Sequence, residues 1–432
     1  MKLLLIFFTL LIFSCSSDKD KKVDLEIFKK QGEKINVFEV NNVFDKEVDS
    51  KTILQLNQAQ LNKKWTYEHY SSNNFYDHFV YEGKFQDIFK KNIGDYINKN
   101  NDSGSLLVFE NFIFFSDEKG RIYKFDLNSQ KTIWELKIYD SSYNDYPKNI
   151  ALFLNGDVLY AADNLGFVYS VDTLTGKTVW QQNYGIPFSS HLNFHKGVLY
   201  VVNQNSRLYA FNPSDGQKIW SFESLSGLIK PSRSSNISIF DNKLLFSNDV
   251  GDITAIDLDQ QVIIWTKNIL SQNNISNNLV FKISNILIDK NDVFVSSNSG
   301  DLFNFNLDTG EIKWSQKLSS IQNHIITDKF LFVLTENAYV IAFNKFNGNI
   351  LWSANLSKLS KDSKIKLDYY GLLLASNNLY ATSSNGDIYK ISALDGKYIL
   401  HKKINSDLSR APIVVDNKIF ILNRSSELII LN

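Results

Sequence analysis

Few groups of residues in this chain of 432 residues have types and spacing suited to catalysis. His191 and His195 stand four positions apart, but they flank a predicted strand and so do not share one helical face that could bind a metal ion. Residues 98–104, NKNNDSG, offer oxygen ligands at alternating positions without the bidentate Glu that closes a calcium-binding loop. The sequence also lacks a P-loop, a nucleophile elbow and a zinc motif. We therefore predict no catalytic residue and no metal site.

Cys15, the single cysteine, points to a covalent modification instead. It follows residues 1–14, MKLLLIFFTLLIFS, in which one Lys precedes an apolar run of about a dozen residues, typical of a signal peptide. Leu-Ile-Phe-Ser-Cys resembles a bacterial lipobox, so we predict that Cys15 carries a lipid. Ser16 stands where Asp would favour retention in the inner membrane, which indicates the outer membrane. The alternative is an ordinary signal peptide followed by an incidental cysteine.

The charge balance argues against nucleic acid as a partner. Lys and Arg together number 46, as do Asp and Glu, so no overall field attracts a polyanion. Aromatic residues make up 14% of the chain and there are only 5 Pro, a composition that favours a large all-β core.

The rest of the chain is organised by an internal repeat. In seven copies, a small first anchor precedes a large apolar residue by fourteen positions, and a polar turn-former follows the first anchor by six. An eighth copy begins at Ser426, and its turn-former would be Asn432, the last residue of the sequence. The seven anchor pairs are Gly120/Trp134, Gly166/Trp180, Ser206/Trp220, Gly251/Trp265, Gly300/Trp314, Ala338/Trp352 and Gly386/Leu400.

The first anchor lies between two apolar runs, which predicts a β-hairpin with Gly at a position of positive φ. Ser206, Ala338 and Ser426 replace this Gly, so we expect a different turn geometry in those three hairpins. A second Gly often stands four residues before the Trp, whereas two copies have Gln130 and Gln261 there.

Each copy thus holds two strands around the first anchor, a third that begins at the Trp, and room for a fourth. Units of roughly 38–49 residues with four strands and no helix are typical of β-propeller blades. Trp65 heads the strand WTYEHY ahead of the first copy, and the eighth copy lacks an outer strand. We therefore predict that the strand at Trp65 completes the last blade and closes the ring. The predicted fold is an all-β, eight-bladed β-propeller of four-stranded blades, closed by an N-terminal strand.

Three regions follow from this interpretation. Residues 1–14 are the predicted signal peptide, residues 15–64 the lipidated N-terminus and a polar tether, and residues 65–432 the propeller. Residues 71–104 lack the repeat and are interpreted as an insertion within the propeller.

The segment DVLYAADNLGFVYSVDTLTGKTVW resembles the PQQ-like repeat. A lipobox together with eight such blades resembles the BamB family, lipoproteins of the outer-membrane β-barrel assembly machinery, and QGEKINVFEV resembles its alphaproteobacterial members. The resemblance implies a non-enzymatic scaffold, lipid-anchored in the outer membrane and facing the periplasm. Its implied partners are a barrel-forming, BamA-like subunit and unfolded outer-membrane β-barrel substrates.

The resemblance also implies where the partner docks, namely on loops between the third, fourth and fifth blades. The matching residues are Gly227, Leu228, Ile229 and Lys230 in the first loop and Asn277 and Asn278 in the second. Lys230 would supply the positive charge, while the acidic residues of the family's second loop are absent here.

Two alternatives concern function. PQQ-dependent dehydrogenases share the repeat, but this sequence lacks their vicinal Cys pair and assigns every Trp to an outer strand, so we predict no enzyme activity and no cofactor. The other alternative is a propeller that binds a small ligand or a cell-wall polymer in its central funnel, because one fold serves many functions.

Overall fold

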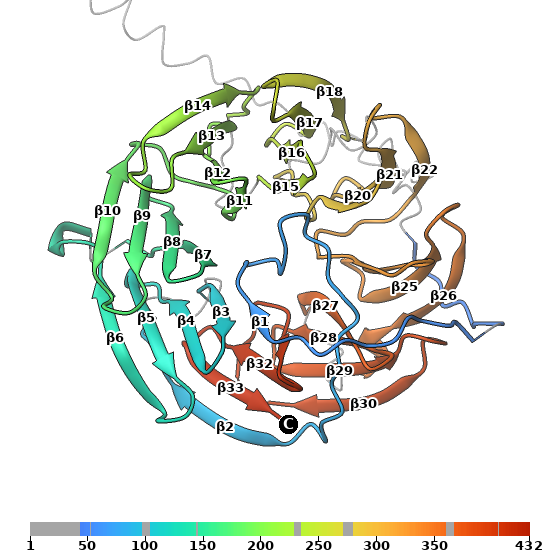
Figure 1. The fold of residues 1–432 in the computed structure, drawn as a ribbon. Coiled ribbons are helices and arrows are strands. Elements are labelled where there is room, and N and C mark those ends of the chain that lie inside the picture. Colours follow the sequence, from blue (N-terminus) through green and yellow to red (C-terminus); the bar gives the residue numbers. More distant parts are fainter. Residues whose placement is uncertain are drawn as a thin grey trace, which may run out of the picture. The chain divides into compact units, whose positions relative to one another are not determined.

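Eight antiparallel sheets surround one central axis in the computed structural model (Figure 1). The structure describes residues 44–51, 53–96, 104–143, 146–228, 235–270, 280–359, 367–404 and 406–432. In seven sheets four strands run in order from the axis to the rim, and the first sheet carries one additional strand at the axis. The predicted all-β, eight-bladed propeller of four-stranded blades is confirmed.

Each repeat forms one blade, and the strands of blades 1 to 4 lie in four consecutive sheets. Blade 1 contains β3 (Leu106–Phe109), β4 (Phe112–Ser116), β5 (Arg121–Asp126) and β6 (Lys131–Lys137). Blade 2 contains β7 (Ile150–Asn155), β8 (Val158–Asp163), β9 (Phe167–Asp172) and β10 (Thr178–Asn183). Blade 3 contains β11 (Asn193–His195), β12 (Val198–Val202), β13 (Arg207–Phe211) and β14 (Lys218–Glu223). Blade 4 contains β15 (Ile237–Phe240), β16 (Lys243–Ser247), β17 (Asp252–Asp257) and β18 (Val262–Asn268).

Blades 5 to 8 repeat the arrangement. Blade 5 contains β19 (Leu287–Asp289), β20 (Asp292–Ser296), β21 (Leu302–Asn306) and β22 (Ile312–Gln316). Blade 6 contains β23 (Ile325–Ile326), β24 (Phe330–Leu334), β25 (Tyr339–Asn344) and β26 (Ile350–Asn355). Blade 7 contains β27 (Tyr369–Ala375), β28 (Asn378–Ser383), β29 (Asp387–Ser392) and β30 (Tyr398–Lys403). Blade 8 contains β31 (Ile413–Val415), β32 (Lys418–Leu422), β33 (Glu427–Leu431) and β2 (Asp87–Asn92). The remaining elements are β1 (Lys64–Trp65) and the 3₁₀ turns η2 (Ser141–Tyr143) and η4 (Leu356–Leu359).

The outer-strand Trp residues join neighbouring blades. Trp134 of blade 1 donates its indole N–H to the Thr173 carbonyl of blade 2 at 2.9 Å. Its ring lies so close to the turn of blade 2 that a Cβ added to Gly176 would lie 2.6 Å from it. The same ring-on-turn contact recurs at Trp180/Gly216, Trp265/Gly310, Trp314/Gly348 and Trp352/Gly396. At these five turns Gly fits because the neighbouring indole occupies the space that a side chain would need.

The hairpin anchors all adopt the same left-handed backbone. Gly120 has φ +81°, while Ser206, Ala338 and Ser426 have φ of +57°, +66° and +57°. The expectation of a different turn geometry at these three residues is therefore wrong. Since an L-residue pays only about 1–2 kcal/mol in this region, the surrounding sheet can impose it.

The strand that closes the ring is β2, and the prediction for Trp65 is wrong. β2 pairs antiparallel with β33, and Figure 1 shows it at the rim of blade 8, beside the C-terminal strand. In blade 8, Phe89 pairs with Ile430, and a bulge leaves Ile88 without a partner in the register. In blade 1, Trp134 pairs with Lys124, and the same kind of bulge leaves out Ile133. Phe89 thus occupies the position of the outer-strand Trp. The blade count survives because the predicted insertion 71–104 contains the missing strand.

Trp65 lies at the axis instead, where β1 extends blade 1 inward by pairing with β3 (Figure 1). Its buried ring packs on Tyr70, Tyr76 and Phe79, with centroid separations of 5.0, 5.6 and 5.8 Å. Burial of this ring, which is 1% exposed, stabilises Trp65 at the axis.

Residues 60–81, which we call the channel segment, hydrogen-bond to the innermost strands around the axis. Asn62 donates to Val414 of blade 8 at 2.6 Å, and the Thr66 carbonyl accepts from Leu154 of blade 2. The Asn74 amide donates to blades 4 and 5. The predicted tether is likewise bound where it is described: Val48 bridges Ser353 of blade 6, and Leu54 bonds Leu394 of blade 7.

Phe89→Ala tests ring closure. We expect it to lower the free energy of unfolding by about 2 kcal/mol, because Phe89 packs on the core and contacts Phe125 of blade 1. Ile88→Ala, the neighbouring and half-exposed position, is the control and should change it by less than about 0.5 kcal/mol. Denaturant unfolding measures both, and equal effects would contradict closure by β2.

Substitutions at the ring-on-turn contact test its requirement for Gly. Gly176→Ala should destabilise the protein by at least about 2 kcal/mol, since φ is +70° and the new Cβ would meet Trp134. Gln130→Gly at the equivalent turn of blade 1, where φ is +55°, should be neutral or stabilising by up to about 1 kcal/mol. Thermal melts of both variants check the pair, and a neutral Gly176→Ala would refute the contact.

A pH series tests the burial of His324. Burial lowers its pKa to about 3, while Nε2 lies 2.9 Å from Ser296 Oγ. An unfolded His titrates near pH 6.5, so the stability gained by burying the neutral ring is complete above pH 6.5 and declines as the pH falls towards 3. Relative to His324→Gln, the unaltered protein should lose about 2 kcal/mol between pH 7 and pH 4.5 in denaturant unfolding. A constant difference would contradict this assignment.

Candidate partner-binding groove

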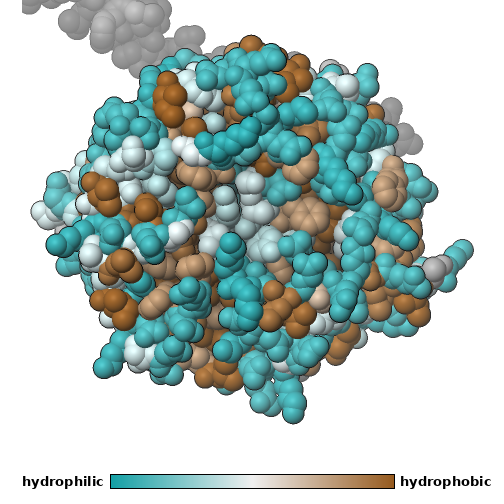
Figure 2. Space-filling model, viewed as in Figure 1, coloured by the Kyte–Doolittle hydropathy of each residue, from teal (hydrophilic) through white to brown (hydrophobic). Residues whose placement is uncertain are grey.

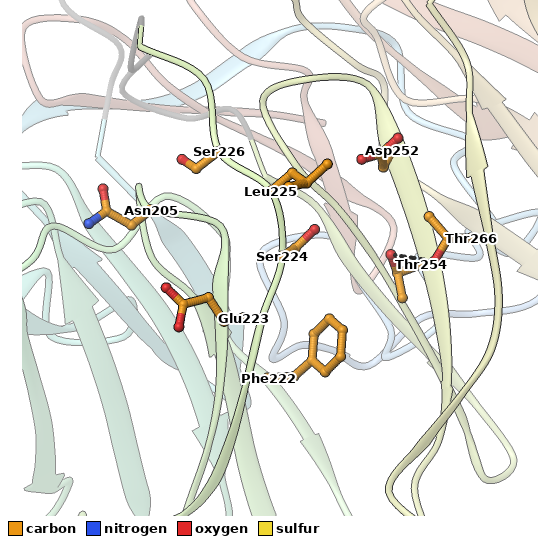
Figure 3. A pocket seen from close by; sticks show the side chains of 9 residues that line it. All are labelled: Asn205, Phe222, Glu223, Ser224, Leu225, Ser226, Asp252, Thr254 and Thr266. Atoms are coloured by element: carbon orange, nitrogen blue, oxygen red, sulfur yellow. Dashed lines mark hydrogen bonds between the residues drawn. The ribbon is translucent and has the colours of Figure 1, made fainter.

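A groove of about 700 Å³ opens at the rim between blades 3 and 4 (Figure 3). Its blade 3 side is formed by the end of β14 and the residues that follow it, and its blade 4 side by β17 and β18. The lining residues are Asn205, Phe222, Glu223, Ser224, Leu225, Ser226, Asp252, Thr254 and Thr266. We call this the blade 3/4 groove.

The alternation of side chains along β14 decides which residues blade 3 exposes at the groove. Along β14, Trp220 and Phe222 are partly buried, whereas Ile219 and Glu223 are exposed. Leu225 continues the exposed set past the end of the strand, and its side chain is 72% exposed. Successive residues of an extended chain point to opposite sides, so Leu225 faces away from the core.

A buried carboxylate holds the loop that follows. Asp249 is buried and accepts the Gly227 amide N–H at 2.9 Å. The hydroxyls of Ser206 and Ser226 lie 3.3 and 3.5 Å from the same carboxylate. Leu228, the next residue, is fully exposed. The loop therefore presents two leucines from a fixed point at the mouth of the groove.

Residues at or just before the start of each predicted docking loop contact one hairpin turn, 248–251 of blade 4. A Cβ at Gly227 would lie 3.3 Å from Val250, and a Cβ at Gly251 would lie 2.6 Å from Leu270. Asn268 adds a hydrogen bond of 3.0 Å to the Val250 carbonyl. Gly227 in the first loop and Leu270 before the second thus contact the same turn, although 43 positions separate them in the sequence.

The polar groups of the groove are suited to binding. Glu223 forms an ion pair with Arg207, and this hydrogen bond raises the pKa of Arg207. Asp252 accepts from Asn248 at 2.9 Å and from Asn268 at 2.8 Å. Thr254 and Thr266 bond each other across β17 and β18, as the dashed line in Figure 3 shows. These carboxylates are already paired, which favours a recognition surface over a catalytic centre.

Across the described ranges, no cluster of three or more His, Cys, Asp or Glu side chains is placed to hold a metal ion. The same part of the chain contains no helix with the length and apolar character needed to cross a membrane.

Comparison with known families decides the relationship. The model for the family described as outer membrane protein assembly factor BamB matches residues 118–354, more than half of the 432 residues. The chain belongs to the BamB family.

Its relatives share the fold at low sequence identity. The BamB protein of Yersinia pestis is 22% identical over 323 residues, which cover 72% of this chain and 80% of the relative. The crystal structure of BamB from Moraxella catarrhalis superimposes with a TM-score of 0.67 at 13% identity, over 80% of this chain and 99% of that one. A quinohemoprotein alcohol dehydrogenase from Pseudomonas putida reaches a TM-score of 0.65 at 9% identity, over 85% and 80% of the two chains.

The structure locates part of the predicted site. Gly227 and Leu228 lie beside the blade 3/4 groove, as described above. Ile229, Lys230, Asn277, Asn278 and the predicted lipidation residue Cys15 lie outside the described residues.

Sequence reasoning missed Leu225 and Asp249. The signal for Leu225 was that it lies an even number of residues after the exposed Ile219 and Glu223, and so on the same face of the strand near Trp220. Asp249 gave no comparable signal, because its role depends on a contact with residues 22 positions earlier in the chain.

Proposed function

We propose that this protein is a non-enzymatic scaffold of the outer-membrane β-barrel assembly machinery. In this role a lipid on Cys15 anchors it in the outer membrane facing the periplasm, and the propeller binds the barrel-forming, BamA-like subunit. Membership of the BamB family supports the class of function. The fold alone does not, because quinoprotein dehydrogenases share it.

The observation that carries the proposal is the pair of exposed leucines at the blade 3/4 groove. Leu225 and Leu228 stand on a loop that Asp249 holds in place. The loop therefore loses little conformational freedom when a partner covers the two leucines. Burying each leucine contributes about 1.5–3 kcal/mol, which is typical of the few residues that dominate an interface.

The surroundings of the leucines also suit docking. On the face shown in Figure 2, apolar side chains form separate spots among hydrophilic ones, which suits a surface that remains soluble without its partner. The groove beside the leucines offers Ser, Thr and Asn side chains for the polar rim of an interface.

A lipid anchor at Cys15 would make the docking efficient. It would confine the propeller to the membrane surface and so raise its effective concentration near an integral partner. Unfolded β-barrel substrates would then be held close to the assembly site, in the simplest case by pairing with an outer edge strand such as β14.

Copurification from detergent-solubilised outer membranes tests the docking surface. Leu225→Asp with Leu228→Asp places two charges where the partner requires apolar contact. We expect recovery of the barrel-forming subunit to fall at least tenfold, while the melting temperature stays unchanged because both side chains are exposed.

Leu174→Asp is the matched control. Leu174 is 68% exposed on the turn between β9 and β10, away from the groove, and its replacement should leave recovery intact. Full recovery with the double variant would refute the groove as the docking site. Failure of the unaltered protein to recover the subunit would refute the proposed function itself.

A further inference from the structure

A second cavity, of about 250 Å³, lies at the axis, and we call it the central pocket. Its walls come from the segments that lead into β15, β19, β23 and β31, from β27, and from β3 of blade 1. The channel segment forms the remaining wall with Trp65, Glu68, His69 and Tyr76. A cavity built by six blades and the channel segment depends on the closed ring and lies apart from the blade 3/4 groove.

The charges that line the central pocket are paired with each other. Arg410 Nη1 lies 2.7 Å from Glu68 Oε1, and the Glu68 side chain is buried. Arg410 is the one Lys or Arg among the described lining residues. An anionic ligand would meet a cation already held by a carboxylate, so the pocket favours a neutral molecule.

The amides of the pocket are held in fixed orientations. Asn285 donates its amide N–H to Asn323 Oδ1, and Asn323 Nδ2 donates to the Tyr76 hydroxyl at 2.8 Å. Gln322 Oε1 accepts the Gly371 amide N–H at 2.9 Å. Asn285 and Gln322 therefore each have one end fixed before any ligand arrives, and Asn323 has both ends fixed.

The other ends of these groups remain available. Asn285 Oδ1 and Gln322 Nε2 form no hydrogen bond with the described residues. One acceptor and one donor thus line a cavity whose other walls include Ile283, Ile321 and Ile413. Hydroxyl groups both donate and accept, and the C–H face of a sugar ring packs on apolar side chains, so a neutral sugar matches both features.

We propose that the central pocket binds a neutral carbohydrate of about one ring. Its volume lies just below the roughly 300–1,000 Å³ of pockets for larger ligands, which fits this size. Asn285 accepts from a ligand hydroxyl, Gln322 donates to another, and the isoleucines cover the ring face.

Isothermal titration of the purified protein with D-glucose, D-galactose and N-acetylglucosamine tests the proposal. We expect at least one to bind saturably, with a dissociation constant on the order of 1 mM, which a ligand of about a dozen non-hydrogen atoms can reach. Glucuronate, a sugar of similar size with a carboxylate, should bind at least tenfold more weakly, because Arg410 is already paired.

Variants assign the binding to the central pocket. Asn285→Ala and Gln322→Ala should each weaken binding about fivefold, and Asn285→Leu with Gln322→Leu should abolish it. Gln260→Leu, at an exposed turn of blade 4, is the control and should bind as the unaltered protein does. The single Ala variants keep the test valid if the double variant melts early.

Three results would overturn the proposal. They are no saturable binding of any of the three neutral sugars at about 20 mM, equal affinity for glucuronate, and unchanged affinity in both Ala variants. None of these results bears on the copurification through Leu225 and Leu228, so the two proposals stand or fall separately.

Discussion

The contact between an outer-strand Trp and the turn of the next blade is the interaction on which the ring depends. It combines burial of an indole, on the order of 200 Å² of surface, with a hydrogen bond such as that from Trp134 to Thr173. The contact comes with a left-handed residue on the neighbouring turn, and at five of the turns, as at Gly176, the indole leaves room only for Gly. Because each blade touches mainly its two neighbours, one repeated contact stabilises most of the interfaces.

A ring built from such contacts still needs its ends joined and its axis filled. The N-terminal region meets both needs, with β2 at the rim of blade 8 and the channel segment at the axis. Without β2, the outer edge of β33 would be unpaired and open to aggregation. The pairing of β2 with β33 joins residues more than 300 positions apart along the chain, as between Asp87 and Leu431, so we expect closure to be a late step in folding.

The closed ring provides two recognition surfaces of different character. The blade 3/4 groove at the rim is open and carries exposed leucines, which suits a protein partner. The central pocket is smaller, polar and formed by several blades together, which suits a small molecule. A quinohemoprotein alcohol dehydrogenase has a similar fold, so the sites and not the fold decide function.

The sequence by itself determined the repeat, the blade count and the all-β class, because the spacing of Gly and Trp reflects contacts inside and between adjacent blades. Its resemblance to a family also proposed Gly227 and Leu228 as docking residues, and this stays a prediction. Only the tertiary structure decided that Phe89 closes the ring, that Trp65 lies at the axis, and that Asp249 holds the loop beside Leu225. The physical reason is that the periodicity of a strand shows which of its residues are apolar and which face of the sheet they share. It does not report which of two apolar N-terminal segments gains more by burial at the axis and which by pairing with a free edge.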